Sequence, residues 1–168
     1  MLSWHINLLA MNTLPQLNFP PFEFRTQRKG DRTEIFDIVR KKYVALTPEE
    51  WVRQHVVHYL HFHRNYPLEL MQTEGSITLN GLSKRCDIVA YDRALKPMLL
   101  VECKQPDVQI SQKTFDQISR YNLVLKVPYM LISNGLQHFC FSLEKSGDRF
   151  LYHSEIPDWK NISHAGTM

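Results

Sequence analysis

Two short apolar segments, residues 85–91 and 97–103, are separated only by a polar stretch at residues 92–96. Each segment has the length and composition of a β-strand, and so short a connection predicts an antiparallel hairpin. The second segment is almost continuously apolar, which is typical of a strand covered on both faces of its sheet. This hairpin therefore constrains the fold most, because it predicts a sheet in which one strand is covered on both faces.

The expected hairpin sets two carboxylates against each other. A turn between Ala94 and Leu95 predicts these opposed pairs: Tyr91 with Met98, Val89 with Leu100, and Asp87 with Glu102. Directly opposed residues have Cβ atoms only ~5 Å apart, and like charges there destabilise the pair. A divalent cation bound by both carboxylates would turn that repulsion into attraction. Lys104 follows Glu102 by two residues, so it leans over the same place.

A metal-free interpretation of the hairpin stays open. Glu102 and Lys104 are also able to pair with each other at a solvated strand end, which is a common and weak interaction. The hairpin alone does not choose between a metal site and such an ion pair.

Two predicted helices flank the hairpin in sequence. Thr47 caps the first, with Pro48 at its first position, and this helix is expected to run to about residue 63. Glu49 is predicted near the middle of its buried face, whereas Glu50 is predicted at the edge as the partner of the cap. Glu49 is therefore the candidate for a third acidic ligand, and Glu50 is the alternative.

The second helix follows the hairpin and begins after Ser111. Gln117 and Tyr121 are spaced i and i+4, so their side chains share one face. Strand, helix and strand over residues 99–132 predict a right-handed crossover with parallel strand pairing. Four histidines of the first helix are spread around its circumference, so they are expected to be exposed or partly packed and not a metal cluster: His55, His58, His61 and His63.

The 168 residues suit one domain with a real core. We expect an extended N-terminal arm over residues 1–21, a single domain over 22–155, and a loose polar tail over 156–168. Residues 22–25 and 34–43 are expected to form short strands.

Three cysteines without CxxC spacing favour buried, reduced thiols and a cytoplasmic setting. No apolar run approaches the ~20 residues that span a bilayer, so no membrane association is expected. The net charge of +3 permits nucleic-acid binding without requiring it.

The acidic residues and the lysine resemble a known motif. Asp87, followed by Glu102-Cys103-Lys104 at the end of an apolar strand, is similar to the PD-(D/E)XK nuclease motif, with Cys86 in place of the usual proline. Gln117 and Tyr121 resemble the Q-xxx-Y element of some of its branches. Residues 47–135 resemble the N-terminal nuclease domain of type I restriction enzyme R subunits (HsdR). The implied fold is α/β, a restriction-endonuclease-like mixed central β-sheet flanked by helices.

The resemblance implies a metal-dependent DNA endonuclease of restriction–modification type, which hydrolyses phosphodiester bonds. Asp87, Glu102 and the main-chain carbonyl of Cys103 would hold Mg²⁺ or Mn²⁺, with Glu49, or alternatively Glu50. Lys104 would orient the attacking water, and Gln117 and Tyr121 would complete the catalytic set. The residues expected to contact nucleic acid are Lys84, Arg85 and Arg120, although Lys84 and Arg85 are equally able to balance local acidic charge.

One feature of R subunits is missing from this sequence. The 168 residues contain no G-xxxx-GK-[ST] phosphate loop, so ATP dependence and translocation are not carried over. DNA is the expected partner, together with a larger restriction or repair complex or a homodimer. Two alternatives remain: a non-catalytic DNA-binding or protein-interaction module with the same fold, and an unrelated α/β protein in which the acids and the lysine are purely structural.

Overall fold

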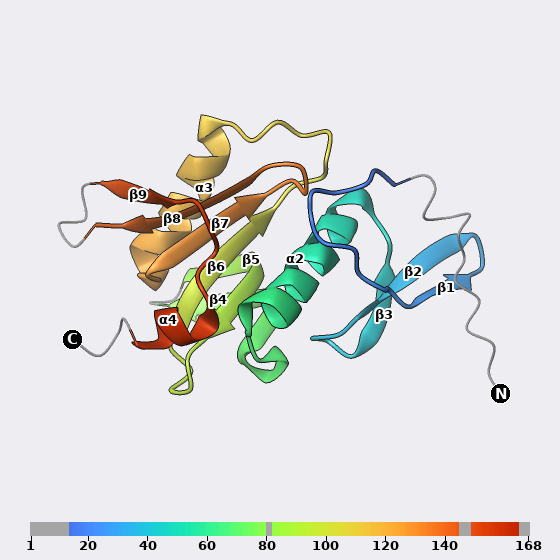
Figure 1. Cartoon of the computed structure of the whole chain (residues 1–168), viewed down its shortest axis with the longest axis horizontal. Helices are drawn as coiled ribbons and strands as arrows, with labels where there is room; N and C mark the ends of the chain where they lie inside the picture. Colours follow the sequence, from blue (N-terminus) through green and yellow to red (C-terminus); the bar gives the residue numbers. More distant parts are fainter. Residues whose placement is uncertain (1–13, 80–81, 145–148, 165–168) are drawn as a thin grey trace.

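Two β-sheets and a long helix between them organise the chain (Figure 1). The computed structural model describes residues 14–79, 82–144 and 149–164. Its elements, in chain order, are β1 (Thr26–Lys29), β2 (Arg32–Asp37), β3 (Lys42–Ala45), α2 (Pro48–Arg64), the 3-10 turn η1 (Leu68–Leu70), β4 (Met71–Leu79), β5 (Leu82–Tyr91), β6 (Pro97–Cys103), α3 (Gln112–Leu125), β7 (Tyr129–Ser133), β8 (His138–Leu143), β9 (Phe150–His153) and α4 (Trp159–His164).

The larger sheet has the strand order β4-β5-β6-β7-β8-β9. Its neighbouring strands are antiparallel except β6 and β7, which are parallel and are connected through α3. The predicted crossover is therefore present, and the predicted mixed central sheet flanked by helices is confirmed.

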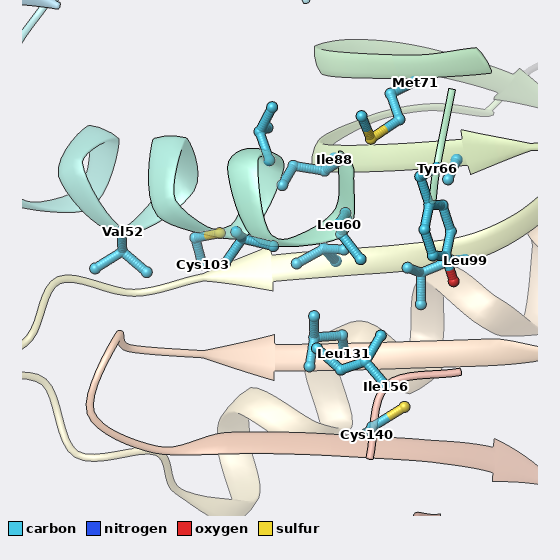
Figure 2. Packing of buried hydrophobic residues seen from close by; sticks show 14 of the residues in the cluster. Val52, Leu60, Tyr66, Met71, Ile88, Leu99, Cys103, Leu131, Cys140 and Ile156 are labelled. Carbon is cyan, nitrogen blue, oxygen red and sulfur yellow. The ribbon is translucent and has the colours of Figure 1, made fainter. Parts of the chain in front are cut away.

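The helices cover the two faces of this sheet unequally. α2 and α4 pack against one face, together with Leu99 and Leu131 of the sheet. Figure 2 shows Val52 and Leu60 extending from α2 toward the strands that carry these residues. α3 covers the opposite face through the fully buried Ile118. β6 is consequently buried on both faces, as its continuous apolar run predicts.

The central hairpin has the predicted register over most of its length. Val89 pairs with Leu100 as expected, but a bulge between Ala90 and Tyr91 sets Tyr91 opposite Pro97 and not opposite Met98. The reason lies in the turn, where Asp92 Oδ1 accepts hydrogen bonds from two main-chain amides and Leu95 takes a positive φ of 60°. The described ladder ends at Ile88 and Val101. The same register, extended by one residue, brings Asp87 opposite Glu102.

α2 begins and ends as its sequence predicts. The main-chain amide of Glu50 donates to Thr47 Oγ1 at 3.1 Å, and Pro48 occupies the first turn, where its missing amide is not needed. At the other end Asn65 adopts the left-handed conformation that closes many helices.

The N-terminal strands differ from the expected ones. The first begins at Thr26, beyond residues 22–25, and the second ends at Asp37 instead of continuing to residue 43. Asp37 stops it because its carboxylate accepts hydrogen bonds from the amides of Val39 and Arg40. The chain then turns back, and the result is a separate three-stranded sheet, β1-β2-β3.

The expectation of a loose tail after residue 155 is wrong for the part that the structure describes. α4 lies there, and Ile156, Trp159 and Ile162 are buried in the same cluster as α2. Trp159 also donates its indole N–H to the carbonyl of Tyr91 at 3.1 Å. Apolar side chains at these spacings cover the sheet face, so this segment is part of the core.

Candidate active site

Glu102 is the centre of a hydrogen-bonded cluster at the end of β6. Its buried carboxylate accepts from the Lys104 ammonium at 2.6 Å and from the Gln117 amide at 2.7 Å, both on Oε1. The same amide of Gln117 lies 3.3 Å from the Tyr121 hydroxyl. Gln117 and Tyr121 come from α3, so the helix and the strand meet at this carboxylate. Four of the predicted catalytic residues are thus brought together.

Asp87 is fixed at the same end of the sheet. Its Oδ2 accepts a hydrogen bond from the main-chain amide of Cys103 at 2.6 Å, and its Oδ1 accepts one from Arg53 at 2.9 Å. The first bond ties Asp87 to the residue that follows Glu102. The second turns the carboxylate toward α2, whereas Val89, two residues later, packs on the α3 side.

Arg53 of α2 is surrounded by carboxylates. Its guanidinium pairs with Asp87, with Glu49 at 3.2 Å, with Glu74 at 3.3 Å and with Glu50. Burial lowers the pKa of Arg53, but the charges of Asp87 and Glu50 outweigh it, so the pKa is raised well above its ordinary value. The guanidinium therefore stays charged and neutralises this side of the site.

A second arginine extends the network to the small sheet. Arg40 pairs with Asp37 at 2.6 Å, with Glu50 at 2.9 Å and with Glu74 at 2.8 Å. Glu74 adopts a positive φ of 50° directly beside this cluster. Such a conformation is strained for a residue with a side chain, and strain of this kind concentrates at functional sites.

The two charged partners at the end of β6 influence each other's protonation. Burial and the neighbouring Asp87 charge raise the pKa of Glu102, while Lys104 opposes that shift. Burial lowers the pKa of Lys104, but its hydrogen bond and ion pair with Glu102 outweigh that effect and raise the pKa overall. Lys104 is accordingly a cation in this arrangement and not a neutral base.

The expected placement of the two acids at the start of α2 is wrong. The Glu50 side chain is 6% exposed and bonds Arg40, Arg53 and Gln54, whereas Glu49 is 44% exposed. The two arginines draw Glu50 inward, which the apolar periodicity of the helix does not reveal. The Glu49 charge is still felt at Glu102 and at Lys104, whose pKa values it helps to raise.

The donor set at this site consists of carboxylate oxygens, which are the ligands that Mg²⁺ prefers. Asp87 and Glu102 interact electrostatically, with Glu49 at the margin. In the part of the chain that the structure describes, no three His, Cys, Asp or Glu side chains are grouped closely enough to hold a metal. Two carboxylates are sufficient for the kind of site in which water supplies the remaining Mg²⁺ ligands.

The residues expected to bind nucleic acid are placed differently from one another. Arg85 is exposed and pairs with Glu74 at 2.5 Å, beside the site. Arg120 is exposed on α3, where its Nε donates to the carbonyl of Asp116. The Lys84 side chain lies outside the described residues.

Two of the four α2 histidines are more buried than expected, whereas His61 is half-buried and His63 is exposed, as expected. His55 and His58 are buried among the aromatic rings of Phe22 and Phe24. Each Nδ1 lies 2.8 Å from the main-chain carbonyl four residues earlier. They therefore belong to the hydrophobic core.

Sequence reasoning missed Arg40, Arg53 and Glu74. Arg53 had a signal, because it lies four residues after Glu49 and three after Glu50, the spacings at which helical side chains of opposite charge meet. The sequence contains no comparable signal for Glu74 and Arg40, because their contact joins segments that are far apart in the chain.

A mixed sheet, helices on both faces, and an acid pair with a lysine at one strand end define a protein of the PD-(D/E)XK nuclease class. Residues 48–157 match the family described as type I restriction enzyme R protein N terminus (HSDR_N). The match covers more than half of the chain, so the protein belongs to this family. It is a nuclease-related domain of the kind found in restriction enzymes.

A solved structure supports the fold. It is a fragment assigned as an HsdR subunit of a type I restriction enzyme from Vibrio vulnificus YJ016, with a TM-score of 0.50 and 17% sequence identity. The likeness covers 70% of this chain and 24% of that one, so the chain spans only a minor part of that protein.

No curated protein matches the sequence. Among the described residues, no helix is long and apolar enough to cross a membrane.

Proposed function

We propose that the chain is a metal-dependent DNA endonuclease domain that hydrolyses phosphodiester bonds. The observation that supports this most directly is the cluster in which Glu102 accepts hydrogen bonds from Lys104 and Gln117, beside Asp87. Structural ion pairs are usually found at solvated edges, but this carboxylate is buried and carries a raised pKa. Perturbed groups of this kind concentrate at functional sites.

Asp87 and Glu102 would hold Mg²⁺, or Mn²⁺ in its place, together with the main-chain carbonyl of Cys103. Glu49 is the further acid at the margin, and Glu50 is its alternative. Mg²⁺ is commonly bound through one or two carboxylates, with water completing its shell. The bound ion would lower the pKa of a coordinated water and neutralise charge on the phosphate.

The chain's own residues would then position the reacting groups and stabilise the charge that develops in the transition state. The charged Lys104 would orient the attacking water and stabilise negative charge that develops on the phosphate. Gln117 would hold the Glu102 carboxylate in one orientation, with the Tyr121 hydroxyl behind it. Arg85, Arg120 and Lys84 would contact the phosphates of the DNA strand.

A second function is favoured by one specific observation. Arg53 pairs with Asp87 and Lys104 pairs with Glu102, so each central acid has a cationic partner within the chain. A domain of this kind could bind DNA or another protein and perform no chemistry. The family membership favours the nuclease, and the experiment below decides between the two.

The setting of the domain is also a proposal. We expect DNA as substrate and either a larger restriction or repair complex or a homodimer as the working assembly, with no ATP site in this chain. A cytoplasmic location would suit its three buried cysteine thiols.

The decisive experiment is cleavage of supercoiled plasmid DNA with Mg²⁺ or Mn²⁺. We expect the wild-type protein to nick or cut, and Glu102→Gln and Lys104→Met each to reduce the rate by about 100-fold, the usual effect of removing one group that stabilises the transition state. Glu144→Gln and Lys96→Met change exposed residues of the same types and serve as matched controls.

Either of two results would contradict the proposal. A wild-type protein that neither cleaves with either metal nor binds either metal in calorimetry is a binding module. Cleavage that survives both site substitutions would arise elsewhere in the chain or from a contaminant, and would remove the catalytic role from this cluster.

A further inference from the structure

The net positive charge of the chain falls in the segment that forms the small sheet. Residues 26–45 contain six Lys or Arg and three Asp or Glu, so their formal charge is +3, the same as that of the whole chain. The remainder of the protein is therefore neutral in sum. This segment also precedes residues 48–157, which match the nuclease family.

One face of this sheet carries like charges in direct opposition. In the β1–β2 ladder Lys29 pairs with Arg32, and both side chains are exposed. Cations directly opposed across a strand pair repel each other. Among the described residues, neither has an ion-pair partner within 4 Å. An external anion that bridges them would relieve this repulsion.

Aromatic residues lie on the same face as these cations. The ladders place Phe36 opposite Tyr43, and their rings are 5.2 Å apart. The Arg25 guanidinium lies over the Phe36 ring at 3.7 Å. The opposite face of β2 carries Ile35, which is fully buried in the core. The face with the cations and rings is therefore the outer one.

The outer face leads to the candidate active site. A cavity of 450 Å³ is lined by Lys42 and Tyr43 of β3 and by Glu49 and Arg53 of α2. Arg53 in turn bonds Asp87. In Figure 1, α2 separates the small sheet from the large one, so its first turn is the shared border. A polyanion on the small sheet would thus extend toward Asp87.

We propose that the outer face of β1–β3 binds the phosphate backbone of duplex DNA and holds it beside the site. We call it the basic surface and define it by Arg25, Lys29 and Arg32, which are exposed and lie on the Phe36 side of the sheet. Its contacts are with phosphate and carry no sequence information, since lysine and arginine on an exposed sheet neutralise charge without reading base edges. The inference extends the proposed function, because it names where the substrate would be held.

The test is binding of a fluorescein-labelled DNA duplex, measured by anisotropy in EDTA over a range of salt concentrations. The variant carries Arg25→Gln, Lys29→Gln and Arg32→Gln. Each lost phosphate contact should reduce the slope of log affinity against log salt by about 0.9, so three should reduce it by about 2 to 3, with an affinity loss of about tenfold or more at low salt.

The matched control carries Arg93→Gln, Lys96→Gln and Lys126→Gln. These residues are exposed and remove the same charge, but they lie at the β5–β6 turn and after α3, at the end of β6 opposite Glu102. We expect the control to keep the wild-type slope. Equal slopes for the two triple variants overturn the proposal. A duplex RNA that binds more tightly than DNA through the same residues overturns the assignment to DNA.

Cleavage is measured separately, so that this inference and the proposed function fail in different ways. Wild-type protein that binds DNA through the basic surface but never cleaves contradicts the nuclease and leaves the surface in place. Wild-type protein that cleaves, with DNA binding unchanged in the first triple variant, contradicts the surface and leaves the nuclease.

Discussion

Among the described residues, Arg53 forms ion pairs with more carboxylates than any other basic side chain. Four carboxylates surround one guanidinium that is only 4% exposed. Burying charges is costly, and the cost is tolerated only while every charge has a partner. Arg53 accordingly connects α2 to Asp87 and shares the positioning of that carboxylate with the Cys103 amide.

Replacing Arg53 by glutamine should destabilise the protein by about 3 to 5 kcal/mol, because it leaves buried carboxylates without compensation. Urea unfolding at neutral pH measures this. Arg28→Gln removes an exposed arginine and should change the free energy of unfolding by less than about 0.5 kcal/mol. A similar small effect at Arg53 would mean that the acids are protonated or solvated in solution.

At the scale of a single element, α2 buries ionisable side chains on its core side. Burial lowers the pKa of His55 to about 4 and also lowers that of His58. The rings pack against Phe24 and Trp51, which hold them away from water. In the folded protein these histidines are therefore neutral at pH values where an unfolded chain would begin to protonate them.

This burial predicts an acid sensitivity with a definite sign. Between pH 6.5 and about 4 the unfolded chain binds a proton at His55 and the folded chain does not, so stability is full above this window and falls as pH decreases through it. The slope from one such group is about 1.4 kcal/mol per pH unit. His55→Phe should flatten the measured dependence of unfolding free energy on pH.

The exposed His63 of the same helix supplies the comparison. His63→Phe should retain the wild-type dependence on pH, because the ring at this position is exposed to solvent. If His55→Phe and wild type lose stability equally on acidification, the carboxylates and not the buried histidine cause the acid sensitivity.

At the scale of the whole molecule, the boundary predicted after residue 155 has an experimental test. Trp159 is buried beneath the sheet, so Trp159→Ala should destabilise the protein by about 3 to 5 kcal/mol. Asn161→Ala, at an exposed position of the same helix, should have an effect within about 0.5 kcal/mol. Thermal or urea unfolding measures both. Equal, small effects would support the original boundary.

The central hairpin and α3 were predictable because their signals are local. Strand alternation and a short polar turn predicted that Asp87 and Glu102 face each other, and the i, i+4 spacing predicted that Gln117 and Tyr121 share a helix face. That this face meets Glu102 was implied by the resemblance to the nuclease family, and the contacts are present. A continuous apolar run predicted that β6 is covered on both faces. These patterns depend only on neighbours in the sequence.

The remainder depends on partners that are distant in sequence. Glu50 was expected at the edge of its helix and is buried, because Arg40 attracts it from ten residues away. The three-stranded small sheet was not predicted as a unit, because the end of β2 is set by a side chain. The Asp37 carboxylate accepts hydrogen bonds from the amides of Val39 and Arg40, and the chain turns there. α4 was expected to be loose, because its apolar residues are few and only the sheet beneath them reveals their role.

The Arg40 contacts have a consequence for evolution. Arg40 lies outside the family-matched residues, yet it pairs with Glu50 and Glu74 inside them. Ion pairs therefore connect the segment before the family-matched residues to acids inside them. Loss of the sheet would remove one cationic partner of each acid and leave Glu50 with Arg53, and Glu74 with Arg53 and Arg85. Changes at the three sites should therefore be correlated among relatives.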